Sequence, residues 1–195
     1  MLLTGWLAML PLAAQVPITY NLHLGALSAQ GDFRTEVGSL TGLDTGLSMT
    51  IPLTQRLDLR PRVSYQLFPV LENNFAYKSS RYSDRGFENA KWSAWSFGAD
   101  CLFHPGGAGS KLYLLTGLSY KAWKVESYGT FTTQDPLLGT RTFSVDDKST
   151  SNEPALDMGL GLALSRHFSV ETRITLASYR KLSYNTLQLG MVARY

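Results

Sequence analysis

The stretch that decides the fold, residues 156–177, reads LDMGLGLALSRHFSVETRITLA. From Leu156 to Leu164, large apolar residues occupy every second position, with small or polar residues between them. The segment that begins at Phe168 alternates in the same way. A period of two is that of a β-strand with one apolar face. Because only Ser165, Arg166 and His167 separate the two runs, the stretch predicts an antiparallel hairpin.

The same alternation recurs along the chain and predicts eight strands. Most of these segments are about nine to twelve residues long, the length that a tilted strand needs to cross the hydrocarbon layer of a membrane. Strands of globular proteins average about five or six residues. The expected strands are residues 18–27, 43–51, 57–68, 91–103, 112–123, 156–165, 168–177 and 184–195.

The connections between these strands alternate in length. Three are short, at residues 52–56, 104–111 and 165–167, and 178–183 is modest. Those at residues 28–42, 69–90 and 124–155 are long. In an up-and-down barrel the short turns would gather at one rim and the long loops at the other, which is typical of membrane β-barrels. We therefore predict an all-β fold: an eight-stranded antiparallel up-and-down transmembrane β-barrel.

The polar face of the strands carries charged residues interleaved with glycines. Small residues beside charged ones are what the narrow interior of an eight-stranded barrel can accommodate. Four negative and five positive side chains nearly balance, as buried charges require. They can be read as an ion-selective constriction or as a packed plug, and the small interior favours the plug. The predicted lumen charge network is Asp58, Arg60, Arg62, Asp100, Lys121, Asp157, Glu171, Arg173 and Arg194, and the glycines are Gly25, Gly46, Gly98, Gly117, Gly159, Gly161 and Gly190.

The other face has no charged residue in the middle of any expected strand, which suits contact with lipid. Aromatic residues on this face near strand ends would form a membrane-interface girdle. A soluble lipocalin-like binding barrel would also alternate, and it remains the alternative fold. The aromatic residues assigned to the lipid face are Tyr20, Tyr65, Trp95, Phe103, Tyr120, Tyr184 and Tyr195.

The composition limits the classes of protein. The chain has 195 residues, is 44% hydrophobic and carries a formal charge of +3. A single cysteine, Cys101, excludes an intramolecular disulfide, and the small, dispersed charge does not suit a nucleic-acid-binding protein. Residues 1–14, MLLTGWLAMLPLAA, are apolar and end in two alanines. We expect them to be a secretory signal peptide, with residues 15–195 forming the barrel domain.

The last eight residues, QLGMVARY, carry a second signal in Gln188, Gly190, Ala193 and Tyr195. Their spacing resembles the C-terminal assembly signal of Gram-negative outer-membrane barrels. With the strand pattern, the mature chain is similar to the small eight-stranded outer-membrane β-barrel family of the outer-membrane protein A or X type. The resemblance implies a monomer in the bacterial outer membrane, in contact with its lipid and lipopolysaccharide and inserted by the outer-membrane barrel insertion machinery.

The long loops are the expected place of function. Aromatic residues in the loop at residues 69–90, Phe75, Tyr77, Tyr82 and Phe87, could bind an extracellular protein or glycan. We expect a structural or surface-interaction role, such as adhesion or shielding.

Other function classes fit the sequence less well. Because His104 and His167 fall in short turns and His23 faces the lumen, no histidine is placed to activate a serine near lipopolysaccharide. We expect no catalytic residue, cofactor or metal and no binding of nucleic acid. A lipid A-modifying enzyme and a narrow pore remain alternatives.

Overall fold

The computed structural model describes residues 17–37, 41–78, 83–107, 109–135, 137, 139–179 and 182–195. The expected signal peptide, residues 1–14, lies outside them. Nine strands and one short helix, α1 (Asp32–Val37), make up this part of the chain. The strands are β1 (Thr19–Gln30), β2 (Thr41–Pro52), β3 (Leu57–Lys78), β4 (Ser83–Phe103), β5 (Leu112–Asp135), β6 (Gly139–Ala163), β7 (Phe168–Tyr179), β8 (Leu182–Ser183) and β9 (Asn185–Arg194).

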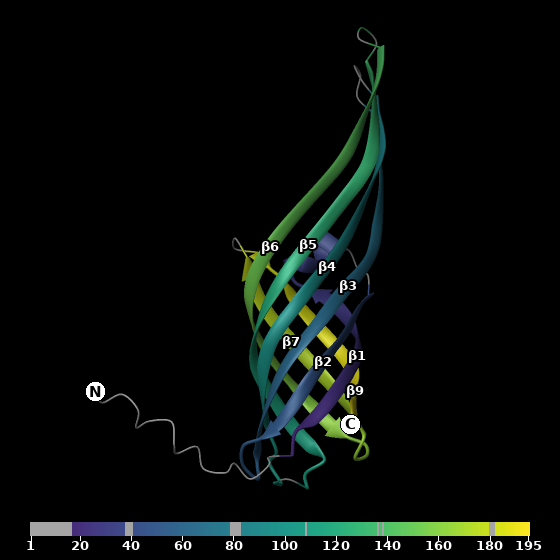
Figure 1. Ribbon diagram of the computed structural model, residues 1–195. Coiled ribbons are helices and arrows are strands. Elements are labelled where there is room, and N and C mark those ends of the chain that lie inside the picture. The colour runs from purple at the N-terminus through teal and green to yellow at the C-terminus, as the bar shows by residue number, and fades with distance from the viewer. Residues whose placement is uncertain are drawn as a thin grey trace, which may run out of the picture.

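Eight of these strands close into a barrel (Figure 1). Each of β1 to β7 pairs antiparallel with the next strand, and β9 lies between β7 and β1, so every strand of the ring has two neighbours. The two-residue β8 pairs only with the end of β7. The predicted fold class is therefore confirmed. Among the described residues, no helix is long and apolar enough to cross a membrane.

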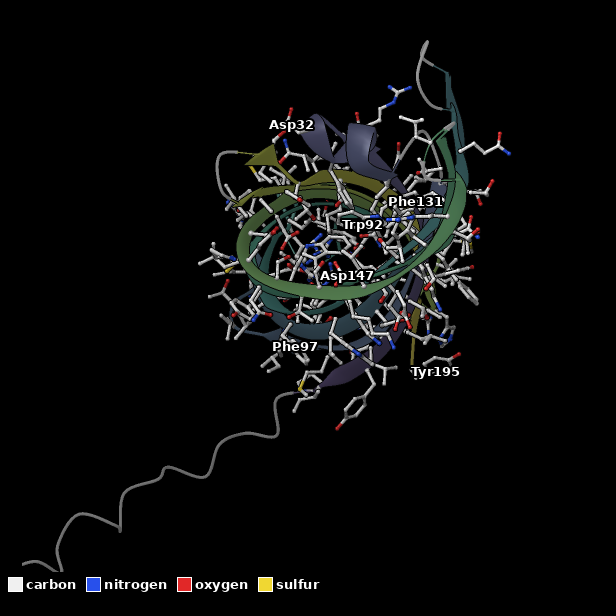
Figure 2. All side chains as sticks on the ribbon, turned by 90° about the horizontal axis from the view of Figure 1, so that it is seen from above. Asp32, Trp92, Phe97, Phe131, Asp147 and Tyr195 are labelled. Atoms are coloured by element: carbon white, nitrogen blue, oxygen red, sulfur yellow. The ribbon has the colours of Figure 1, made fainter. Side chains whose placement is uncertain are left out.

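The side chains alternate across the barrel wall as the strand pattern predicts. On β6, Asp157 is fully buried in the lumen while its neighbours Leu156 and Met158 are 40% and 42% exposed on the outside. Figure 2 shows the same contrast on β4, with Trp92 inside the ring and Phe97 outside it. The outward apolar side chains form the belt that faces lipid.

The two ends of the barrel differ. Short turns join β2 to β3, β4 to β5 and β6 to β7 at one end, called the turn end below. The C-terminus also lies there, because the backbone of Tyr195 bonds to that of Tyr20 in β1. The opposite end, called the hairpin end, carries the connections that the sequence predicts to be long.

Two of these long connections are strands, so the expectation of loops at residues 69–90 and 124–155 is wrong. β3 and β4 stay paired out to Lys78 and Ser83, and β5 and β6 out to Asp135 and Gly139. The four strands rise beyond the barrel as a curved sheet (Figure 1), called the projecting sheet below. Its hydrogen-bonded ladder needs no apolar face, because water covers it outside the membrane. The apolar alternation on which the prediction rested therefore stops before the strands do.

The third connection holds α1, which the period-two pattern does not predict. Its Phe33 and Val37 are fully buried against the lumen at the hairpin end. Tyr184 belongs to the same buried cluster, so its assignment to the lipid face is wrong. Tyr184 and Tyr195 are eleven positions apart, and residues an odd number apart lie on opposite faces of a regular strand.

Candidate functional site: the barrel interior and the projecting sheet

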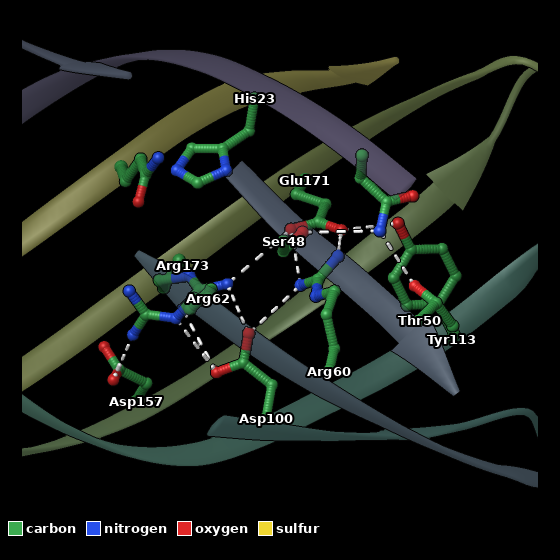
Figure 3. A network of polar contacts seen from close by, with 12 residues as sticks. His23, Ser48, Thr50, Arg60, Arg62, Asp100, Tyr113, Asp157, Glu171 and Arg173 are labelled. Atoms are coloured by element: carbon green, nitrogen blue, oxygen red, sulfur yellow. Dashed lines mark hydrogen bonds and ion pairs between the residues drawn. The ribbon is translucent and has the colours of Figure 1, made fainter. Parts of the chain in front are cut away.

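The lower half of the lumen, toward the turn end, holds a network of buried charges around Asp100 (Figure 3). Asp100 is 0% exposed and accepts hydrogen bonds from three guanidinium groups. The donor–acceptor distances are 3.2 Å to Arg60, 3.3 Å to Arg62 and 2.8 Å to Arg173. Such buried charges are tolerated only when each one is paired.

Two further carboxylates complete the network. Glu171 accepts two bonds from Arg60, one of them at 2.9 Å, and Asp157 accepts one from Arg62. The residues come from β3, β4, β6 and β7, on different sides of the ring. Because three arginines alternate with three carboxylates, the network links these strands across the lumen and fills it.

An aromatic residue closes the network toward the turn end. The Tyr113 hydroxyl donates to Glu171 at 2.7 Å, and the ring lies against Gly161. A Cβ atom on that glycine would be 2.1 Å from the ring of Tyr113, so the close approach requires glycine. The Arg194 guanidinium lies 5.6 Å from the centre of the same ring.

The remaining predicted lumen residues lie on either side of this layer. Asp58 bonds to His104 at 2.9 Å beside a polar hollow of about 250 Å³ at the turn end. Lys121 lies toward the hairpin end, fully buried, and donates to Gln66 at 3.1 Å. The structure thus brings six of the nine predicted charges into one network and places Asp58, Lys121 and Arg194 around it.

Between the network and β1 lies a small cavity. It is lined by His23, Asp44, Ser48 and Gln188 together with the arginines, and its volume is about 20 Å³. This volume is close to that of a single water site. Asp44 is held by His23 at 3.2 Å and by Gln188 at 2.8 Å.

The upper half of the lumen is aromatic, which the sequence pattern does not predict. Phe33 of α1 inserts into it and is 0% exposed. Its ring centre lies 5.0 to 5.4 Å from those of Phe68, Trp92, Trp123 and Tyr184. The signal that could have found this plug is an apolar pair four positions apart, Phe33 and Val37, inside an otherwise polar connection.

Hydrogen bonds between Asp32 and Ser183 hold α1 in place. The Asp32 carboxylate accepts bonds from the backbone N–H and the hydroxyl of Ser183 at 2.9 and 3.1 Å. The Asp32 backbone N–H donates to the Ser183 hydroxyl at 3.1 Å. These bonds join the connection between β1 and β2 to the connection between β7 and β9 at the hairpin end.

The aromatic residues proposed for extracellular binding lie in or beside the projecting sheet. Phe75 and Tyr77 are in β3 and Phe87 is in β4, where the register pairs Phe75 with Gly86 and Phe87 with Asn74. Tyr82 lies outside the described residues. The segments that hold these aromatic residues form a paired hairpin where a loop was expected.

The outer part of β5 and β6 is polar, with few apolar side chains. Phe131 and Phe143 stack at 4.9 Å between ring centres, directly opposite each other in the ladder. Below them, Lys124 bonds to Glu126 at 2.8 Å, and this hydrogen bond lowers the pKa of that carboxyl. A hollow of about 480 Å³ between Lys91, Tyr128 and their neighbours opens on this surface.

The residues of the expected C-terminal signal lie on β9 and at the terminus. Gln188 points inward to Asp44, and Gly190 lies beside Gly25 of β1. Tyr195, drawn outside the ring in Figure 2, is 79% exposed. Ala193 pairs with Leu22 of β1 and Phe168 of β7, so the final strand closes the barrel between β1 and β7.

The fold of this chain, unlike its sequence, has counterparts among known proteins. No protein-family model matches the chain, and no curated protein matches it by sequence. Among solved structures, it is similar to Ail, the attachment invasion locus protein of Yersinia pestis, with a TM-score of 0.50 and 12% identity over 91% of this chain and 98% of that chain. For Ail in complex with the heparin analogue sucrose octasulfate, the TM-score is 0.56 at 10% identity, with 91% and 99% covered.

A third similar structure is Neisserial surface protein A, with a TM-score of 0.43 and 14% identity over 91% of this chain and 97% of that chain. At these identities the likeness to Ail concerns the fold. It agrees with the closed ring of eight strands. The chain therefore has the fold of the small eight-stranded outer-membrane β-barrels.

Proposed function

We propose that this protein is a surface-interaction barrel of the bacterial outer membrane, which presents its projecting sheet to extracellular macromolecules. The observation that carries the proposal is an open sheet edge on β6. β6 pairs with β7 only from Ala155 onward. Residues 139–154 have no strand partner among the described residues except β5. An open edge is a template on which another chain can add a strand.

The backbone of β6 shows which groups are available for such pairing. Ala163 donates its N–H to Lys111, before β5, and Leu164 donates to Phe168 of β7. The register with β5 has no shift along β6. Because hydrogen-bonding direction alternates along a strand, the even-numbered residues beyond Pro154 point their N–H and C=O groups toward the open side.

The opposite edge of the projecting sheet, on β3, is less suited to pairing. Pro69 lacks an N–H group there, and the register with β4 shifts between Phe68 and Leu71. Proline and bulges are devices that protect sheet edges. Each edge has one proline at its base, Pro69 on β3 and Pro154 on β6, but the ladder of β6 with β5 has no register shift, so the β6 edge is the more regular of the two.

A matched pair of substitutions at Ser144 tests the proposal. Ser144→Pro removes one N–H on the open side and leaves the ladder with β5, whereas Ser144→Ala keeps that N–H. Bacteria displaying the natural protein should adhere to surfaces coated with extracellular-matrix proteins more than bacteria without it. We expect Ser144→Pro to lower this adhesion and Ser144→Ala to retain it. Equal adhesion of both variants, or none above the empty strain, would count against the proposal.

The barrel itself supports the proposed location. Its outward belt is apolar, and its aromatic residues Tyr20, Trp95, Tyr120 and Tyr195 are exposed on that face. We infer that lipid and lipopolysaccharide surround this belt, and that the barrel insertion machinery recognises the final strand during assembly. A signal peptide would supply the export step.

We further propose that the protein is not an enzyme. The positions of the histidines support this: His104 and the exposed His167 lie in turns at the turn end, and His23 lies in the lumen. Lipid A extracted from cells with and without the protein should therefore give identical mass spectra. A change in acylation that is lost when a serine or histidine is replaced would establish the enzymatic alternative.

A further inference from the structure

We propose that the partner of the open β6 edge is a second copy of the same edge, carried by a barrel in a facing membrane. This inference rests on the proposed function, because it names the partner of the same edge. The residues concerned, 139–149, form the outer part of β6 in the projecting sheet (Figure 1).

The edge is complementary to itself in one antiparallel register. When Ser144 of one copy lies opposite Ser144 of the other, Arg141 lies opposite Asp147 and Phe143 lies opposite Val145. The two-fold symmetry repeats each pair, so the interface has two Arg–Asp pairs and two apolar pairs. An interface between identical copies requires such self-complementarity.

The backbone allows this register. Even-numbered residues, which point their N–H and C=O groups to the open side, lie opposite even-numbered residues and exchange hydrogen bonds. Arg141 and Asp147 then form a non-hydrogen-bonded pair, as do Phe143 and Val145. Side chains approach most closely in pairs of this kind, so the charges and the apolar groups meet where contact is closest.

The neighbouring allowed registers lose this match. A shift of the partner strand by two residues, the smallest that keeps even-numbered residues opposite each other, places Arg141 opposite Val145 or Ser149. A shift by four residues toward the barrel places Asp146 of one copy opposite Asp146 of the other, and like charges directly opposite are destabilising. The register centred on Ser144 therefore pairs opposite charges without bringing like charges together.

The two charged residues are available for this pairing. Both Arg141 and Asp147 are exposed, and neither takes part in the ion pairs of the described residues. Their neighbours on β5 are uncharged, since Arg141 lies opposite Thr133 and Asp147 opposite Ser127. Each charge thus lacks a cross-strand counterpart within its own sheet and gains one in the paired register.

Antiparallel pairing also fixes how the two barrels are placed. It relates the strands by a two-fold axis perpendicular to the sheet, so the second β6 runs in the opposite direction. The projecting sheet rises away from the barrel (Figure 1), and the partner barrel therefore lies beyond the hairpin end with its axis reversed. Two barrels in one membrane cannot meet this condition, whereas barrels on two cells can.

Charge reversal in two strains tests the proposal. Arg141→Asp places like charges opposite each other in a homotypic pair, and so does Asp147→Arg. When cells of the two variants are mixed, each Asp meets an Arg again. We expect cells with the natural protein to settle from suspension as aggregates, each single variant to lose this aggregation, and the mixture of differently labelled variants to regain it.

The outcomes separate this inference from the proposed function. Variants that aggregate like the natural protein, a mixture that stays dispersed, or natural cells that do not aggregate would each overturn self-pairing. If self-pairing fails while Ser144→Pro still lowers adhesion to coated surfaces, the edge binds a different partner. If Ser144→Pro changes neither adhesion nor aggregation, both proposals fail. Unboiled gels of each strain verify equal amounts of folded barrel.

Discussion

Asp100 is the residue through which the lower lumen is connected. It is fully buried and bonded to Arg60, Arg62 and Arg173. Replacement by an uncharged side chain leaves three guanidiniums sharing two carboxylates in a buried site. The energetic consequence is large because a buried charge that loses its partner keeps its desolvation cost.

We predict that Asp100→Asn lowers the free energy of unfolding by about 3–5 kcal/mol. Urea titration of the protein refolded into lipid vesicles, followed by tryptophan fluorescence, measures this change. Asp147→Asn is the matched control, because its carboxylate is exposed on the projecting sheet, and it should change stability by less than about 0.5 kcal/mol. Equal stability of the two variants would show that Asp100 is not the centre of the network.

A second prediction at the residue scale concerns Gly161. Its missing Cβ would lie 2.1 Å from the Tyr113 ring, so Gly161→Ala forces that ring to move from its bond to Glu171. We expect a loss of about 1–3 kcal/mol in the same titration. Gly109→Ala, where no atom lies within 4 Å of the added Cβ, should leave stability unchanged. If Gly161→Ala left the free energy of unfolding unchanged, the lumen would have space for the added methyl group.

At the scale of the elements, α1 closes the lumen with Phe33, beside the buried Val37. Phe33→Ala removes ring contacts with Phe68, Trp92, Trp123 and Tyr184. We predict a stability loss of about 3–5 kcal/mol, together with greater quenching of tryptophan fluorescence by acrylamide.

The control for this change lies in the same helix. The exposed Arg34 can be replaced by Ala without touching the aromatic cluster, and we expect unchanged quenching. If acrylamide quenches the tryptophan fluorescence of the Phe33→Ala and Arg34→Ala variants to the same extent, the strands alone would seal the aromatic cluster. The helix α1 would then be a surface feature.

For the whole molecule, the closed ring predicts resistance to detergent. Because every strand of the barrel has two neighbours, no edge is open below the projecting sheet. Unboiled protein from purified outer membranes should migrate on a denaturing gel differently from boiled protein. Recovery from the soluble periplasm with no shift on boiling would contradict a membrane location.

The whole molecule also bears on conduction. Charges fill the lower lumen, the aromatic cluster fills the upper lumen, and the cavity beside the charge network measures about 20 Å³. We predict that planar-bilayer recordings of the reconstituted protein show no discrete conductance steps. Steady single-channel steps that change with Arg62→Ala would establish the pore instead.

The alternation of residues 156–177 is a local property, and it predicts the hairpin of β6 and β7 without knowledge of the rest of the chain. The charged positions on the polar face follow from the same parity. The error at Tyr184 came from assigning it to the face of Tyr195, although the two residues are an odd number of positions apart, and the error at residues 69–90 and 124–155 came from requiring an apolar face. Strands outside the membrane have water on both sides, so their sequences carry no such mark.

By itself the sequence determined the barrel, because lipid on one side and a filled lumen on the other impose a period of two on every spanning strand. The same alternation predicts nine charges on the inward face, but it does not predict Asp44 and Glu153, which are also buried. Only the tertiary structure decided that Asp100 gathers three arginines, that Phe33 closes the lumen and that one edge of β6 stays open. These contacts join residues far apart in the chain, and the ring closure that brings them together leaves no signal in any single segment.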